Sequence, residues 1–466
     1  MALKRSLKAR HLNMIAMGGS IGTGIFLALG ATINQAGPGG ALVAYGSIGF
    51  MVYFLMTSLG EMATYMPESG SFGIYASKFV DPAFGFAIGW NYWYNWAVTV
   101  AAEMVAGALI MKYWFPNIPS ILWSAIFLVL IVFLNLLSAR AYGESEYWFA
   151  SIKVFTVIVF IIIGVLTITG VISGYTMGIK NFTIGEAPFV GGMKSIFMIF
   201  LIAGFSFQGT ELVGVAAGES EDPDKNIPKA INTIFWRILI FYIGTIFVVG
   251  ALIPYTEAGV NVSPFTMVFQ NAGIVRAASL MNAVILTSVL SAGNSGMYAS
   301  SRMLYAMAKE GTAPEFLGKV NKRGVPVNAI IITTIVAAAC FLTGIYAEDT
   351  VYTWLIASSG LAGFITWIGI ALCHYRFRKA YLAQGNKLSD LKFTAKWFPL
   401  GPAVALVLCI IVVLGQGITY FVTVNIDWIG IISSYIGLPL FLALWLGFKM
   451  KYKTKVINIM DIDLKK

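Results

Sequence analysis

The chain has 466 residues, of which 58% are hydrophobic and 11% are charged, and its formal net charge at pH 7 is +10. A soluble domain carries roughly 25% charged residues, so the composition excludes an ordinary soluble protein and predicts an all-α integral membrane protein. The three cysteines and the two histidines stand singly, without the spacing of a metal site or a disulfide framework. We therefore expect neither a metal nor another cofactor.

Apolar runs of about 20 residues, the length that crosses roughly 30 Å of hydrocarbon, follow one another along the chain. Twelve spans are predicted, near residues 12–34, 40–66, 84–111, 120–138, 147–173, 193–218, 229–254, 275–306, 326–345, 352–374, 399–421 and 428–448. The first span follows a basic start but is longer than a signal peptide and lacks a cleavage site, so we expect it to remain as a helix.

The basic residues predict the orientation of the spans. With twelve spans both termini lie on one side, and most of the 31 lysines and arginines fall in the loops of that side. Cytoplasmic loops carry such an excess, so both termini are expected in the cytoplasm. The net charge then reflects contact with anionic lipid headgroups, and nucleic acid is not an expected partner.

Two predicted spans carry glycines and polar residues at mid-depth: the first, with GGSIGTGIF (18–26), and the sixth, with GFSFQGTELVG (204–214). Each interior glycine disfavours a helix by about 1 kcal/mol relative to alanine. Paired broken helices indicate a midplane site in a transporter. The N–H groups of a break favour a carboxylate and its free carbonyls favour an ammonium, so a zwitterionic amino acid suits both. The alternative, close helix packing at glycine, is equally acceptable for the first motif alone, but the second motif favours a site.

Spans 1 and 6 each begin a predicted five-helix repeat, and an odd number of spans inverts the second copy. We expect a basic N-terminus over 1–11, the first repeat over 12–185 and the second repeat with an inner connector over 186–396. Two additional helices follow over 397–448, and a basic C-terminus covers 449–466. The polar end of the connector, 376–396, is expected to be solvated.

Four of the ionisable residues within the spans are candidates for a function, because a charge inside the membrane is costly. Glu211, beside the second break, is a candidate to carry a proton or pair with a cationic substrate, or else to accept backbone hydrogen bonds. Glu103 is a candidate for binding a substrate ammonium or a proton, with a buried interhelical hydrogen bond as the alternative. Lys153 is placed six residues into span 5, where its stem can also reach the surface. Glu61 suits a structural or gating role.

The motifs RHLNMIAMGGSIGTGIF, GWNYWYNWAVT, GFSFQGTELVGVAAGESEDPDKNIPKA and VLSAGNSGMYASSRMLYAMAKEG resemble the amino acid permease branch of the amino acid, polyamine and organocation superfamily, and its bacterial lysine permeases in particular. The likeness runs from about residue 10 to residue 450. It implies a five-plus-five inverted-repeat fold in the bacterial cytoplasmic membrane. It also implies uptake of L-lysine by proton symport and alternating access, without sodium. A membrane enzyme is not expected, because the sequence lacks a plausible catalytic set.

The resemblance also implies roles for individual residues. The first break would bind the α-carboxylate and part of the amine through Ser20, Gly22, Thr23 and Gly24. The second break would contribute Phe205, Ser206 and Gln208. Lys153 matches a lysine whose amine takes the place of sodium, so it is expected in proton coupling together with Glu211 and Glu103. Related permeases for aromatic substrates carry acidic residues at positions like Glu103 and Glu211, so neither residue identifies the group that binds the side-chain ammonium.

Two other functions remain open on the sequence. One is exchange of amino acids, or transport of another amino acid of the family. The other is a membrane receptor that senses an amino acid, which the absence of an attached signalling domain disfavours. Protein partners are not indicated.

Overall fold

The computed structural model describes residues 14, 17, 20–68, 71–137, 139–172, 179–260, 262–271, 275–417 and 428–465. The predicted N-terminal segment 1–11 and the first two glycines of the first glycine-rich motif, Gly18 and Gly19, lie outside these residues.

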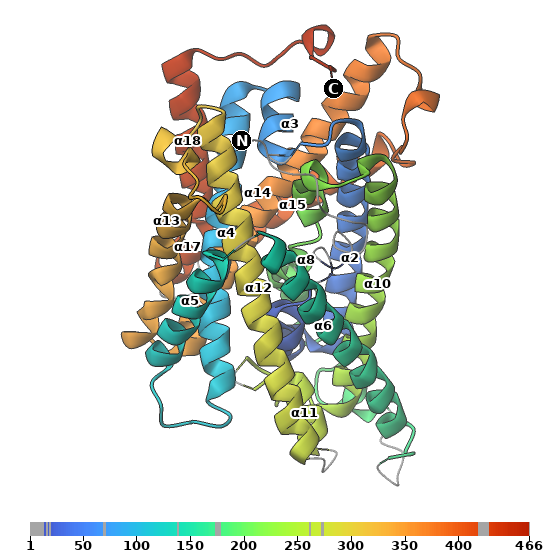
Figure 1. Cartoon of the computed structure of the whole chain (residues 1–466). Helices are drawn as coiled ribbons and strands as arrows, with labels where there is room; N and C mark the ends of the chain where they lie inside the picture. The colour runs from blue at the N-terminus through green and yellow to red at the C-terminus, as the bar shows by residue number, and fades with distance from the viewer. Residues whose placement is uncertain are drawn as a thin grey trace.

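The regular elements of the described residues are helices, as the composition predicts. They are η1 (Gly24–Ala28), α2 (Leu29–Tyr65), α3 (Ser71–Phe79), α4 (Pro82–Met111), α5 (Ser120–Asn135), α6 (Ala139–Ile168), η2 (Lys180–Thr183), α7 (Gly192–Met198), α8 (Phe200–Phe207), α9 (Leu212–Ala216), η3 (Ala217–Glu219), α10 (Pro223–Leu252), α11 (Pro264–Asn271), α12 (Val275–Lys309), η4 (Glu315–Gly318), α13 (Val327–Ala337), η5 (Ala338–Gly344), α14 (Glu348–Ala383), η6 (Leu388–Asp390), α15 (Leu400–Gly415), α17 (Trp428–Tyr435), α18 (Gly437–Tyr452) and η7 (Ile459–Asp461). Figure 1 shows them gathered into one elongated bundle.

Seven helical segments of the described residues are long and apolar enough to cross a membrane, and the bent pair α17 and α18 makes an eighth. The first of the seven, Gly24–Tyr65, has 42 residues, about twice the length that a bilayer requires. It is kinked at Gly37, which has a φ of 74° and precedes Pro38. The N–H groups of Gly39 and Gly40 there donate to the carbonyl of Pro188, at 2.9 and 3.1 Å, which satisfies backbone donors that the kink frees.

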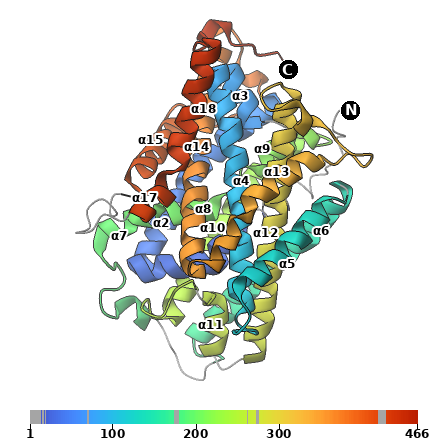
Figure 2. The ribbon, with the colours of Figure 1, turned by 90° about the vertical axis from the view of Figure 1, so that its left-hand side faces the viewer.

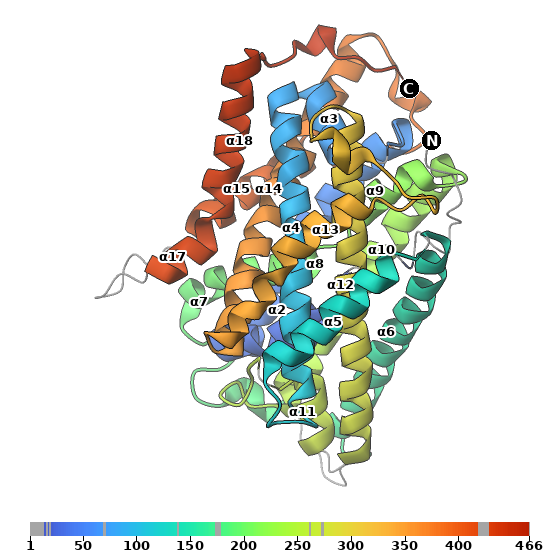
Figure 3. The ribbon, with the colours of Figure 1, turned by 60° about the vertical axis from the view of Figure 1, so that its left-hand side comes forward.

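Helix α4 lies at the centre of the bundle. Its apolar window is 94% buried, and it packs against α12, α14, α3 and α18. Figures 2 and 3 show it running between these helices. By contrast α5 exposes large side chains such as Val129 and Phe133. A helix that is apolar on all sides is either buried in a protein core or spans a membrane. Because α5 exposes its apolar side chains on the outside of the bundle, it is expected to face lipid.

The two ends of the bundle carry short helices that were not predicted. Helix α3 lies at one end and α11 at the other, in all three views (Figures 1, 2 and 3). Both are too short to span a membrane, so a search for apolar runs of membrane length misses them.

The C-terminal segment packs back onto the α3 end of the bundle. The N–H of Ile457 donates to the carbonyl of Val80 at 2.9 Å, and the hydroxyl of Tyr65 donates to the carbonyl of Leu464 at 2.9 Å.

The expectation of a solvated connector over 376–396 is wrong for its first part. Helix α14 continues to Ala383. On it, Arg378 is 4% exposed and donates to both carboxylate oxygens of Glu61. Glu61 also accepts a hydrogen bond from the N–H of Ala395 at 2.7 Å. The ion pair of Glu61 and Arg378 therefore joins the ends of α2 and α14, and the bond from Ala395 attaches the segment that follows α14. Arg378 is buried because it pairs with a buried carboxylate on another helix. The polar sequence around Arg378 does not reveal this partner.

Candidate functional site

Both interrupted helices are present where the glycine-rich sequences predict them. In the first, regular α-helical structure is lost at Ile21 and Gly22, and the π-helical turn η1 begins at Gly24. In the second, α8 ends at Phe207, Gln208 is extended, and Gly209 has a φ of 97° before α9 begins at Leu212. This left-handed φ favours glycine because it has no Cβ.

The two breaks touch each other. A Cβ added to Gly24 would lie 2.5 Å from the Cα of Ser206, so only glycine permits this approach. The hydroxyl of Tyr242, on α10, lies 2.8 Å from the carbonyl oxygen of Ser20 and also contacts the carbonyl oxygen of Ser206. A hydroxyl has one proton to donate, so Tyr242 donates to one of these two carbonyls at a time.

A cavity lies between the breaks, α4 and α12. Its walls are formed by Ser20, Gly22, Thr23, Gly24, Trp96, Thr99, Glu103, Phe205, Ser206, Gln208 and Ala292. The structure therefore brings all eight residues expected to bind substrate to one place. The cavity holds about 20 Å³, which is room for a water molecule but far below the roughly 300 Å³ of a small-molecule site. A substrate requires these walls to move apart.

Glu103 is the acidic residue on the cavity wall. It is 3% exposed. Its Oε1 accepts a hydrogen bond from Thr23 Oγ1 at 3.0 Å, and its Oε2 has no hydrogen-bond partner among the described residues. Leaving a buried carboxylate oxygen without a donor costs free energy. An ammonium group or a proton bound at this oxygen would remove that cost.

A hydrogen-bonded network beside the cavity joins the second break to α4 and α14. The amide of Gln208 donates to the carbonyl of Ser359 at 3.2 Å. The hydroxyl of Ser359 lies 2.7 Å from Thr99 Oγ1 and donates to Asn95 Oδ1 at 2.7 Å. These bonds hold the side chains of α4, the break and α14 in one arrangement.

Glu211 does not line the cavity. It is 1% exposed, and its two carboxylate oxygens accept the N–H of Gly209 at 3.2 and 3.1 Å. The structure thus contains the alternative in which the carboxylate of Glu211 accepts a backbone hydrogen bond. Its position still leaves it next to Gln208 in the broken segment.

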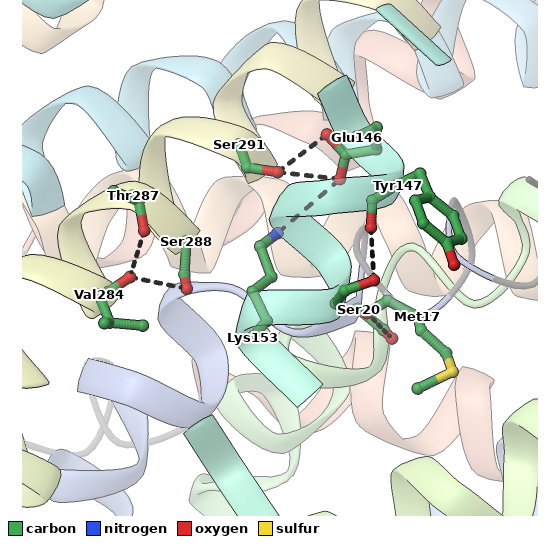
Figure 4. A network of polar contacts seen from close by, with 10 residues as sticks. Met17, Ser20, Glu146, Tyr147, Lys153, Val284, Thr287, Ser288 and Ser291 are labelled. Carbon is green, nitrogen blue, oxygen red and sulfur yellow. Dashed lines mark hydrogen bonds and ion pairs between the residues drawn. The ribbon is translucent and has the colours of Figure 1, made fainter. Parts of the chain in front are cut away.

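Lys153 is fully enclosed by the bundle. Helix α6 begins at Ala139 rather than near 147, so Lys153 lies about 21 Å from the start of the helix, measured along its axis at 1.5 Å per residue. It is 0% exposed, and the alternative of a stem reaching the surface is wrong. Its Nζ lies 3.9 Å from Oε1 of Glu146, which accepts hydrogen bonds from Ser291 through both oxygens at 2.9 Å. Figure 4 shows this group between α6 and α12.

Lys153 and Glu103 also interact electrostatically. The buried group consequently contains two carboxyl groups, Glu103 and Glu146, and one amino group. With all three ionised it would have a net charge of −1, and burial makes an uncompensated charge expensive. One additional positive charge, carried by a proton or a substrate, balances it.

Sequence reasoning missed several of these residues. Trp96 and Thr99 recur at helical spacing with Glu103, which was predicted, and the three share one face of α4. Trp96 and Thr99 stand in the GWNYWYNWAVT motif, so this signal was available. Glu146 and Lys153 are seven residues apart, two turns on the same face, but the predicted span began after Glu146. Tyr242 has no local signal, because only the packing of α10 brings its hydroxyl to the breaks.

Comparison with known proteins decides the family. Residues 11–459 match the family described as amino acid permease. The chain belongs to the amino acid permease family. The permease is 57% identical to the lysine-specific permease of Escherichia coli (strain K12), over 99% of this chain and 96% of that protein. It is 53% identical to the lysine-specific permease of Lactococcus lactis subsp. cremoris (strain MG1363), over 99% of this chain and 93% of that protein.

A histidine permease from the same Lactococcus strain is also similar, at 51% identity over 99% of the permease and 98% of that protein. Relatives named for lysine and for histidine thus differ little in overall identity to this chain. Amino acid transport follows from the family, whereas overall identity does not distinguish lysine from histidine as the substrate.

Proposed function

We propose that the permease imports L-lysine by proton symport through alternating access. The single observation that carries this proposal is the Glu103 carboxylate oxygen, in the cavity between the two broken helices, that has no hydrogen-bond partner among the residues the structure describes. A substrate ammonium supplies the donor and the positive charge that this oxygen lacks. The similarity to two lysine-specific permeases supports lysine as the substrate.

The breaks supply the remaining contacts in this proposal. The N–H groups at Gly22 to Gly24 bind the α-carboxylate, since the start of a helix favours a negative charge. The carbonyl and side-chain groups of Phe205, Ser206 and Gln208 contact the amine and the beginning of the side chain. Thr23 lies near both charged groups of the substrate in this proposal, because it borders the first break and donates a hydrogen bond to Glu103.

Proton coupling rests on the buried charges. In symport the proton crosses the membrane together with the substrate, so a second buried group must hold the proton while the substrate ammonium occupies Glu103. Lys153, paired with Glu146, holds a fixed positive charge between α6 and α12, so no sodium is required. Glu211 carries a proton beside the second break, where it is shielded from solvent.

Alternating access is supported by the size of the cavity, which has no room for lysine in this structure. The short segments on either side of the breaks are the elements that move in this proposal. We further propose the twelve-span, five-plus-five inverted-repeat arrangement with the domain limits 12–185, 186–396 and 397–448. The kink at Gly37 fits this count, since it divides a segment of 42 residues into two.

The membrane potential is sufficient to drive import. In a cytoplasmic membrane with both termini inside, each positive charge that enters gains about 2.3 kcal/mol per 100 mV. This corresponds to roughly fiftyfold accumulation.

The deciding experiment is uptake of labelled lysine into proteoliposomes that contain only this protein, with the pH gradient and the membrane potential varied separately. Lysine accumulation driven by a pH gradient at a clamped potential supports symport. Uptake that occurs only against internal substrate supports exchange instead. Competition by histidine as strong as competition by unlabelled lysine would support the second candidate, a permease that accepts histidine, which the similarity to a histidine permease favours.

A further inference from the structure

A second hollow lies away from the cavity, where α4 begins and α12 and α18 end. It is a groove of about 540 Å³, within the size range of small-molecule sites. Phe86, Trp90, Phe448 and Tyr452 form an aromatic wall. The rings of Phe86 and Phe448 are stacked at 4.6 Å, and those of Phe448 and Tyr452 lie 4.4 Å apart.

One side of the groove is formed by α18, a helix on the outside of the bundle. Helix α18 packs against α4 and runs along the outside of the bundle in Figures 2 and 3. Its surface exposes Leu446 and Met450 at 50% and 73%, which is expected of a helix in contact with acyl chains. Aromatic and basic residues at the end of such a helix mark the level of the lipid headgroups.

One end of the groove is cationic. Lys451 lines it, with Nζ 5.1 Å from the ring centre of Tyr452. Lys453 and Lys455 follow directly and are exposed. The nearby carboxylate Asp81 is already paired with Lys449 at 2.8 Å, so it does not neutralise Lys451. The groove is thus apolar along its wall and positive where it meets the headgroup level.

We propose that this groove binds one anionic phospholipid, with an acyl chain against Phe86, Trp90 and Phe448 and the phosphate at Lys451. An anionic lipid complements both parts of the groove, whereas a zwitterionic lipid complements its apolar wall alone. A basic side chain near an anionic lipid surface contributes about 1 kcal/mol, or fivefold in affinity. This inference is independent of the transported substrate, because the groove shares no lining residue with the cavity.

Two substitutions separate the acyl and headgroup contributions. At Gly447, on the wall of the groove, an added Cβ meets no atom within 4 Å, so Gly447→Leu fills the groove without displacing the backbone. Lys451→Ala removes the charge and keeps the shape. The matched controls are Gly46→Leu, another helical glycine whose Cβ would meet no atom within 4 Å, and Lys392→Ala, an exposed lysine of the connector.

The experiment uses the full-length protein in phosphatidylcholine nanodiscs that contain a small fraction of photoreactive phosphatidylglycerol, with cross-linked peptides mapped by mass spectrometry. We expect labelling of the peptides that contain Phe86 to Trp90 and Gly447 to Tyr452. It should fall about fivefold in Lys451→Ala, be lost in Gly447→Leu and persist in both controls.

Equal labelling by photoreactive phosphatidylcholine would overturn the proposal, because the groove would then hold lipid without regard to charge. Unchanged labelling in both groove variants would overturn it as well. So would cross-links from the groove to a second copy of the chain, which would show a protein occupant.

Discussion

Thr23 donates a hydrogen bond to Glu103 across 3.0 Å and thereby joins the first broken helix to α4 at the wall of the cavity. This contact leaves the second oxygen of Glu103 without a donor among the described residues. The same carboxylate therefore stabilises the break and offers a site for a positive charge.

Glu103→Gln keeps an acceptor for Thr23 and removes the charge. We expect lysine binding to weaken by about 10- to 100-fold, because a hydrogen bond to a charged group contributes about 1.5–3 kcal/mol. The measurement is equilibrium binding of labelled lysine to the purified protein. Thr23→Ser, which retains the hydroxyl, serves as the control. Affinity that is unchanged in Glu103→Gln would show that the ammonium binds elsewhere.

Glu211→Gln tests proton coupling without touching the cavity wall. We expect it to abolish accumulation driven by a pH gradient and to change lysine binding by less than about threefold, since Glu211 does not line the cavity. Uptake into proteoliposomes as a function of pH, with binding measured alongside, distinguishes the two effects. Full uptake with an unaltered pH profile would remove Glu211 from the coupling mechanism.

Lys153→Ala should reduce uptake at least about tenfold, because Glu146 and Glu103 lose a buried cation, and breaking a buried pair costs about 3–5 kcal/mol. Lys387→Ala, at an exposed lysine, is the control and should have little effect. The double variant Lys153→Ala with Glu146→Gln should recover thermal stability relative to Lys153→Ala alone. If the losses of stability in Lys153→Ala and Glu146→Gln simply added up in the double variant, the two residues would not interact.

Gly24→Ala introduces a methyl group 2.5 Å from the backbone of Ser206. We expect it to lower the free energy of unfolding by about 1–3 kcal/mol and to impair uptake, since the two breaks are forced apart. Gly46→Ala, where the methyl group meets no atom within 4 Å, should be neutral or stabilising. Thermal melting of the two purified variants makes the comparison, and equal melting temperatures would contradict the close contact of the breaks.

Asp81 should make stability depend on pH at the α3 end of the bundle. Burial raises the pKa of Asp81, but the hydrogen bonds from Lys449 and from the N–H of Ala83 outweigh it and hold the pKa below its usual value. The resulting stabilisation is complete above the unfolded-chain pKa of about 3.9 and is lost as the pH falls through the lower pKa of the folded protein.

Asp81→Asn keeps the cap of α4 and removes the charge, so it should lower stability at pH 7 by at most about 1 kcal/mol. Melting temperatures of the wild type and the variant should converge as the pH is lowered below about 4. A difference that persists unchanged at low pH would show that the ion pair is not its source.

The sequence alone determined the class of protein, the location of both broken helices and the residues of the cavity wall contributed by the breaks. These features are local: apolar runs of membrane length reflect the solvent, and glycines reflect the backbone conformation of their own segment. Glu103 and Lys153 were recognised because a charge inside a membrane helix is costly wherever it lies. The length of α14 beyond residue 374 was not recognised, because its polar end resembles a loop.

Only the tertiary structure decided what the buried charges face. Glu146 becomes the partner of Lys153 because α6 begins earlier than its apolar run and α12 supplies Ser291. Tyr242 reaches both breaks because α10 packs against α2, and Arg378 is buried because Glu61 lies opposite it at the end of another helix. Each of these relationships joins residues on different helices, or on a helix whose start is set by its neighbours. Composition and spacing constrain a single segment, whereas the energy of a buried charge depends on the partner that the fold places beside it.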